Sequence, residues 1–170
     1  MIGDIQCLTV WQPWASLLAL GAKQYETRGW PTRYRGPVAI HASIQWRRED
    51  AILCLQEPFR FALEAAGVEL DAEALSWKTR RPPRVLPLGV VLAVGELVDC
   101  IETWPPPADV PGYELAFGDW GPARFAWRIA NVVRLAEPVP SKGQQGLYPL
   151  PRAARPAVED QLGRTAARES

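Results

Sequence analysis

The stretch from Leu8 to Ser43 constrains the fold of this chain more than any other segment. Within it, apolar segments flank a G-x-K-x-x-E-x-R motif, formed by Gly21, Lys23, Glu26 and Arg28. Three charged side chains so close together are costly to bury unless they pair with one another or serve a ligand. Glu26 and Arg28 share one face of an expected strand, and Lys23 enters from the end of the preceding helix. We therefore expect Glu26 to lie within reach of at least one cation, in a surface ion pair or in a cleft.

The rest of the chain predicts a mainly β fold of the α+β class. Residue patterns predict strands at 5–10, 25–30, 38–41, 90–100 and 124–135, and helices at 13–20 and 46–67, the latter broken by Pro58. Loops rich in proline, glycine or arginine are expected at 31–37, 71–84, 104–112 and 138–151. The strand at 90–100 is apolar on both faces, as in a barrel. We therefore predict a small β-barrel with added helices, some of them in an insertion.

One domain is expected, because 170 residues suffice for a single core. We place this domain at residues 1–150. Residues 152–170 are polar and rich in alanine and arginine, and Val158 and Leu162 are their only sizeable aliphatic side chains. We therefore expect residues 151–170 to form a C-terminal helix or tail that contributes little to the core.

Composition argues against a membrane protein and against a metalloprotein. No segment approaches the roughly 18 apolar residues of a membrane span, and the N-terminal residues lack the apolar core of a signal peptide. Cys7, Cys54 and Cys100 are far apart, form no C-x-x-C pair, and share the chain with a single histidine, His41. We therefore expect no metal and no cofactor, and free thiols in a reducing cytoplasm.

Charge is unevenly distributed, although the net charge is zero. Basic residues gather at 23–48 and 78–84, and acidic residues gather at 95–119. A basic face suits a polyanion such as nucleic acid; alternatively, the blocks neutralise one another across the fold. The eight tryptophans can fill a core or stack on bases.

Six strings in the same order resemble the activating signal cointegrator homology (ASCH) domain family. They are QPWASLL, GAKQYETR, YRGPVAIHAS, LPLGVVLAVGELVDC, FGDWGPARFAWRI and KGQQGL, which together span about residues 7–148. The resemblance implies a fold similar to the pseudouridine synthase and archaeosine transglycosylase (PUA) domains, a β-barrel with a helix over a cleft. Members of the family are linked to RNA, to transcription coactivation and to modified nucleosides.

The resemblance also assigns residues to the cleft. It implies that Lys23, Glu26 and Arg28 line it, and it matches Glu96 to a later carboxylate. Some small bacterial members are amidohydrolases that deacetylate N4-acetylcytidine. In that branch a threonine, thought to be the nucleophile or its carrier, stands where Glu26 stands here. The resemblance therefore does not carry this activity over to the present chain.

Three functions remain open from the sequence. The first is an RNA- or modified-nucleoside-binding domain, in which arginines hold phosphate and aromatic rings stack on bases. Its candidate ligand-binding residues are Trp14, Lys23, Glu26, Arg28, Trp30, Arg33, Tyr34, Arg35 and His41. The second is a hydrolase of RNA or of an acylated nucleoside, with Lys23, Glu26 and Glu96 as catalytic residues. The third is a protein-interaction domain, in which the same trio is a packed ion pair. The sequence makes no prediction of oligomeric state.

Overall fold

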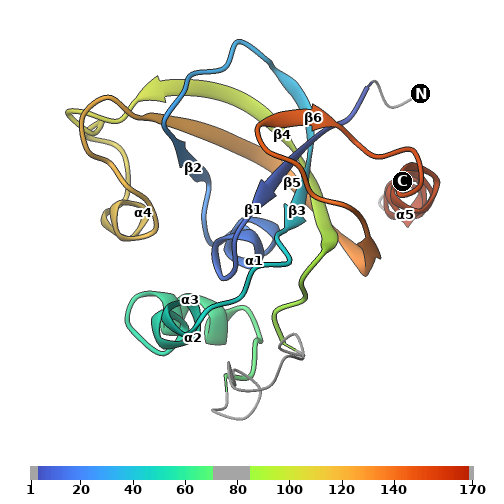
Figure 1. Ribbon diagram of the computed structural model, residues 1–170, viewed down its shortest axis with the longest axis horizontal. Helices are drawn as coiled ribbons and strands as arrows, with labels where there is room; N and C mark the ends of the chain where they lie inside the picture. Colours follow the sequence, from blue (N-terminus) through green and yellow to red (C-terminus); the bar gives the residue numbers. More distant parts are fainter. Residues whose placement is uncertain (1–3, 71–84, 169–170) are drawn as a thin grey trace.

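The computed structural model describes residues 4–70 and 85–168, whose strands form one mixed sheet (Figure 1). The strands are β1 (Gln6–Val10), β2 (Tyr25–Arg28), β3 (Gly36–Ala42), β4 (Val90–Glu102), β5 (Phe125–Pro140) and β6 (Leu147–Pro149). They lie in the order β2-β5-β4-β3-β1-β6; β1 and β3 are parallel, and the other neighbouring pairs are antiparallel. The sheet curls into a half-barrel, which confirms the predicted fold class.

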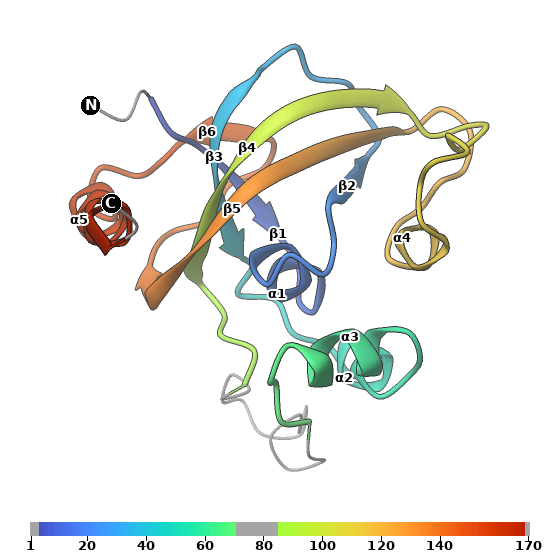
Figure 2. The same cartoon turned by 180° about the vertical axis from the view of Figure 1, so that it is seen from behind.

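Helix α1 lies between the sheet and the two helices α2 and α3. The helices are α1 (Trp14–Ala19), α2 (Arg48–Cys54), α3 (Phe59–Ala65), α4 (Gly112–Ala116) and α5 (Arg155–Arg168). Strands β4 and β5 arch over α1, and α2 and α3 lie on its other side (Figure 2). Leu18 packs in the core beneath the sheet, whereas the adjacent Leu17 packs with residues of α2 and α3. Among the described helices, none is long and apolar enough to cross a bilayer.

The curvature of the sheet is concentrated in the long pair β4 and β5. Their register shifts at three places, between Val91 and Ala93, between Val94 and Glu96, and between Leu97 and Asp99. Such irregularities bend a strand and increase its twist. Gly95 lies at the second of them, where an added Cβ would be 2.7 Å from Ile129 Cγ2 and 3.0 Å from Val132 Cγ2. Glycine at this position therefore lets the two strands approach closely as they curl.

Most predicted elements are present, with three differences. The helix expected at 46–67 is divided at Pro58 into α2 and α3, as predicted. Helix α4 was not expected, because five residues after a proline-rich loop are too few for a helical period to be visible. Strand β5 continues to Pro140 and β6 forms within the closing segment, because both pair with strands distant in sequence. The expected loop at 71–84, with its basic cluster 78–84, lies outside the described residues.

The C-terminal segment contacts the core, and the expectation that it contributes little to the core was wrong. Residues 155–168 form α5, which packs beside β5 (Figure 1). Val158 is fully buried and Ala154 is buried in the same cluster as Ile5 and Leu135. The sequence shows few aliphatic residues here, but one buried valine and its neighbours are enough to seat the helix on the sheet.

Truncation after Pro151 is therefore expected to destabilise the protein. Loss of α5 exposes apolar surface around Leu135 and removes the buried Val158, at a cost of about 2–4 kcal/mol in the free energy of unfolding. Thermal and urea denaturation measure the loss. Val158→Asp should reproduce it, whereas Ala157→Asp, on the exposed face of α5, should not. An unchanged melting temperature after truncation would restore the original expectation.

Candidate functional site

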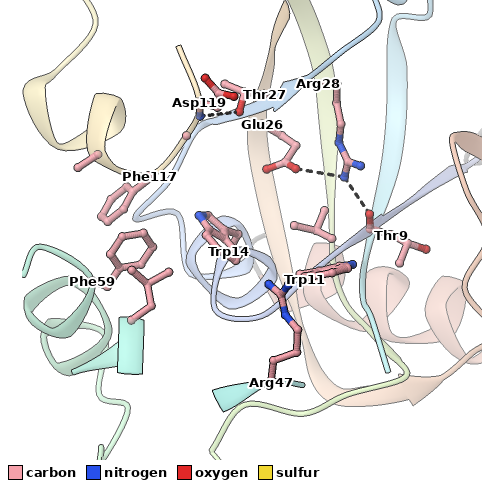
Figure 3. A pocket seen from close by; sticks show the side chains of 14 residues that line it. Thr9, Trp11, Trp14, Glu26, Thr27, Arg28, Arg47, Phe59, Phe117 and Asp119 are labelled. Atoms are coloured by element: carbon pink, nitrogen blue, oxygen red, sulfur yellow. Dashed lines mark hydrogen bonds and ion pairs between the residues drawn. The ribbon is translucent and has the colours of Figure 1, made fainter. Parts of the chain in front are cut away.

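A cavity of about 520 Å³ opens between the sheet and the helices. One wall is aromatic and is formed by Trp14 of α1, Phe59 of α3 and Phe117 after α4 (Figure 3). Phe59 meets Trp14 and Phe117 edge-on, with ring centroids 5.9 and 5.0 Å apart. The opposite side carries Glu26 and Arg28 of β2 (Figure 3). The cavity therefore combines apolar ring surface with a carboxylate and a guanidinium, which is typical of a ligand site.

Glu26 and Arg28 form an ion pair at the edge of the cavity. Arg28 Nη2 lies 3.1 Å from Glu26 Oε1 and donates a 2.8 Å hydrogen bond to the carbonyl oxygen of Thr9. The two-residue period of β2 places both side chains on one face, as predicted. The expectation that Glu26 pairs with a cation is confirmed. Because β1 and β2 both hold the guanidinium, the pair is fixed before any ligand arrives.

Lys23 lies behind this pair and not in the cavity. Its side chain is 1% exposed, its Nζ lies 3.6 Å from Glu26 Oε2, and it also donates a hydrogen bond to the carbonyl oxygen of Tyr25. Burial lowers the pKa of Lys23 below its ordinary value, and the carboxylates of Glu26 and Glu114 oppose this shift. The expectation that Lys23 lines the cleft is therefore corrected. Lys23 is a buried partner of Glu26 and does not line the cavity.

Glu114 of α4 completes the buried charge cluster, and sequence reasoning missed it. Its Oε1 accepts a 2.5 Å hydrogen bond from the backbone N–H of Gln24, and its Oε2 accepts a longer one from Tyr25 N–H. Burial raises the pKa of this carboxyl group, while Lys23 and the two N–H donors act in the opposite direction. Glu114 thereby attaches α4 to the start of β2. A lone acid in the apolar run before Phe117 was its only signal in the sequence.

The other candidate residues are divided between the cavity and the rest of the surface. Trp14 lines the cavity, and Trp30 lines a second cavity beside it. Three residues of the β2–β3 segment, Arg33, Tyr34 and Arg35, line neither cavity. The Tyr34 hydroxyl donates to the carbonyl oxygen of Pro37, and Arg35 pairs with Asp99 at 3.3 Å.

His41 and Glu96 lie outside both cavities. His41 is buried between β1 and the segment before β6: Nε2 donates to the carbonyl oxygen of Ser141 at 3.1 Å, and Nδ1 lies 3.2 Å from Thr9 Oγ1. Glu96 is exposed on β4 and accepts a 2.8 Å hydrogen bond from Asn131. The structure therefore does not bring Glu96 to Lys23 and Glu26, and the three do not form a common catalytic centre. Within the described residues, no group of three or more acidic, histidine or cysteine side chains could hold a metal ion.

The cavity lies in a part of the chain that matches a known protein family. The family model described as "ASCH domain" matches residues 8–119. The chain belongs to the ASCH domain family. Every residue that lines the first cavity lies within the matched stretch, from Thr9 to Asp119.

Two curated relatives are similar to part of this chain. Activating signal cointegrator 1 from Homo sapiens is 35% identical over 95 residues, and the protein of the same name from Mus musculus is 34% identical over 95 residues. In each case the match covers 56% of this chain but 14% of the relative. The chain therefore spans only a small part of the length of these relatives.

Trp11 and Arg47 also line the cavity and, like Phe59 and Phe117, were not among the predicted site residues. The Arg47 guanidinium lies over the Trp11 ring, 4.1 Å from its centroid, and pairs with Asp50 of α2 at 3.1 Å. Trp11 is 39% exposed and borders both cavities. The sequence W-Q-P-W contains Trp11 and Trp14, but the residue pattern of this short loop did not show which of the two tryptophans is exposed.

The burial of His41 makes the stability of this ASCH domain dependent on pH. Burial lowers the pKa of His41 below its ordinary value of 6.5, so the unfolded chain binds a proton before the folded chain does. The free energy of unfolding should therefore fall as pH decreases below about 6.5, by at most about 1.4 kcal/mol per pH unit.

Urea denaturation between pH 5 and 7.5 measures this dependence. His41 is the only histidine, so His41→Gln should flatten the profile. The raised pKa of Glu114 contributes a slope of opposite sign, but it is present in both proteins and cancels in their difference. Parallel profiles for the two proteins would show that folding does not shift the pKa of His41.

Proposed function

We propose that this ASCH domain binds RNA, with one nucleotide of the strand in the cavity between β2, α1 and α4. The observation that carries the proposal is the union, in one 520 Å³ space, of an aromatic wall with the Glu26–Arg28 pair. Pockets for small ligands have volumes of about 300–1,000 Å³ and combine apolar walls with a few polar groups. A nucleotide presents matching features, because its base has two apolar faces and a polar edge, and its phosphate is anionic.

The polar groups of the cavity suit different parts of such a nucleotide. Glu26 is acceptor-only when ionised, and each of its oxygens has lone pairs beyond those used by Arg28 and Lys23. It can therefore accept hydrogen bonds from the N–H groups of a base or from a ribose hydroxyl. Arg28 and Arg47 border the same space and can pair with phosphate oxygens. The links of the ASCH family to RNA agree with this assignment.

Filling the cavity should abolish RNA binding without disturbing the fold. Ala116, at the end of α4, lines the cavity and is exposed, so Ala116→Trp occupies the space without removing a buried contact. We expect the affinity for a fluorescein-labelled single-stranded RNA decamer, measured by anisotropy, to fall by about 10-fold or more, which is about 1.4 kcal/mol. The melting temperature should remain close to that of the wild type.

Ala153→Trp is the matched control, because Ala153 is exposed in the turn before α5 and lines neither cavity. It should bind the RNA decamer as the wild type does. Wild-type affinity in Ala116→Trp would place RNA elsewhere on the protein and reject the proposal.

A further inference from the structure

A second cavity, of about 650 Å³, continues from the first. The two cavities share Thr9, Trp11 and Arg28. The remaining lining of the second cavity comes from Trp30, after β2, and from the segment 144–146, before β6. That segment lies beyond the part of the chain that the family model matches. The ligand space therefore extends past the Glu26–Arg28 pair, to a region that the first cavity does not include.

Trp30 gives the second cavity an exposed aromatic surface held in a fixed position. Its side chain is 41% exposed, and its ring stands edge-on against the buried Trp127, with centroids 5.8 Å apart. The indole N–H of Trp127 also donates a 3.2 Å hydrogen bond to the carbonyl oxygen of Trp30. An indole held in this way loses little conformational entropy when a flat ring stacks on it.

Arg28 lies between the two cavities with hydrogen-bonding capacity to spare. Its Nη2 serves both Thr9 and Glu26, but its Nε is buried and has no hydrogen-bond partner among the described residues. Its guanidinium carbon lies 5.6 Å from the centroid of the Trp30 ring. Buried donors are rarely left without a partner. A guanidinium beside an aromatic face, at the junction of two cavities, suits the phosphate that joins two nucleotides.

A chain of partly buried hydrogen bonds holds the segment 144–146, which also lines the second cavity. Because the Ser141 carbonyl can only accept, His41 Nε2 carries the proton and Nδ1 accepts from the Thr9 hydroxyl. Thr9 Oγ1 is then free to accept from Tyr148 Oη at 2.8 Å and from the backbone N–H of Gln144 at 3.3 Å. This chain holds the segment in place before a ligand binds.

The same segment presents polar groups to the cavity. Gln144 and Gln145 are exposed, and their side chains make no hydrogen bond within the described residues. An amide side chain can donate and accept at once, as the edge of a base requires. Because Gln144 and Gln145 line the same cavity as Trp30, they can contact the edge of a base that stacks on the indole.

We propose that the second cavity holds the nucleotide next to the one in the first cavity, with its base stacked on Trp30 and the linking phosphate on Arg28. The ligand is then a single strand, because a paired base could not stack on the indole. It has at least two nucleotides and is not a free nucleoside, because each cavity holds one nucleotide. This inference rests on the proposed function, since it assigns the first nucleotide to the first cavity.

Nucleotide length tests the inference. The four nucleoside 5′-monophosphates and the dinucleotides ApA, CpC, GpG and UpU compete with the labelled RNA decamer for the wild-type protein. We expect the tightest dinucleotide to bind about 10-fold or more tightly than its monophosphate, since stacking on an aromatic side chain contributes that much. Trp30→Leu keeps an apolar contact with Trp127 but removes the stacking face. It should abolish this gain and leave the monophosphate affinity within about twofold of the wild type.

Trp104→Ala is the matched control, because Trp104 is 61% exposed and lines neither cavity. Its dinucleotide gain should be unchanged, and Trp30→Phe should retain most of the gain because it keeps an aromatic face. If monophosphates bind and Ala116→Trp weakens them, but a second nucleotide adds nothing, the second subsite is refuted while the proposed function stands. A gain that survives in Trp30→Leu refutes the stacking role. Absence of all nucleotide binding refutes both proposals.

Discussion

Replacing Lys23 with alanine is expected to lower the free energy of unfolding by about 3–5 kcal/mol, because removing the cation of a buried charge cluster leaves the Glu114 carboxylate without a cation. Lys23 is 1% exposed and is the cation that faces both Glu26 and Glu114. Arg28 still pairs with Glu26 in this variant, whereas Glu114 retains only its backbone N–H donors. Urea denaturation at pH 7 measures the change.

Lys142→Ala is the control for this measurement. Lys142 is exposed in the segment before β6, and its loss should change the free energy of unfolding by no more than about 0.5 kcal/mol. If the free energy of unfolding changes as little in Lys23→Ala as in Lys142→Ala, Lys23 is solvated and free to reach the ligand, contrary to its position in the structure.

Replacing Arg28 with alanine is expected to weaken binding of the RNA decamer by about 10- to 100-fold, since hydrogen bonds to charged groups contribute about 1.5–3 kcal/mol. Arg28 is the charged residue that borders both cavities. If it contacts one phosphate, the slope of log affinity against log salt should also become shallower by about 0.7, the value for one phosphate of a single strand.

Arg152→Ala provides the comparison for Arg28→Ala. Arg152 is exposed before α5 and lines neither cavity, so both affinity and salt slope should match the wild type. Equal affinities for the two variants would contradict the role of Arg28. A loss of affinity with an unchanged slope would assign Arg28 to holding Glu26 and not to a phosphate.

The sequence was sufficient to predict the arrangement of the motif along β2 but not its depth. The two-residue strand period alone places Glu26 beside Arg28, and the structure confirms their pairing. Whether Lys23 faces solvent depends on α4, which supplies Glu114, 90 positions farther along the chain than Gln24. No local pattern around Lys23 carries that information.

The same reason explains the other differences between expectation and structure. Val158 reads as an isolated aliphatic residue, and its burial depends on the surface offered by Ile5 and Leu135. Trp11 and Arg47 contact each other only because the turn after β1 and the start of α2 converge. The residue types of such side chains are visible in the sequence. Which of them lie together depends on long-range packing, so it became visible only in the structure.

Locating a bound strand tests the RNA-binding site most directly. We propose a crystal structure of the full chain with the RNA trinucleotide that competes most strongly with the decamer. We expect one base against the aromatic wall of Trp14 and Phe117, with its edge or its ribose in hydrogen-bond contact with Glu26, and a phosphate on Arg28. RNA bound instead on the segment that carries Arg33 and Arg35, with the cavity free of nucleotide, would contradict the site.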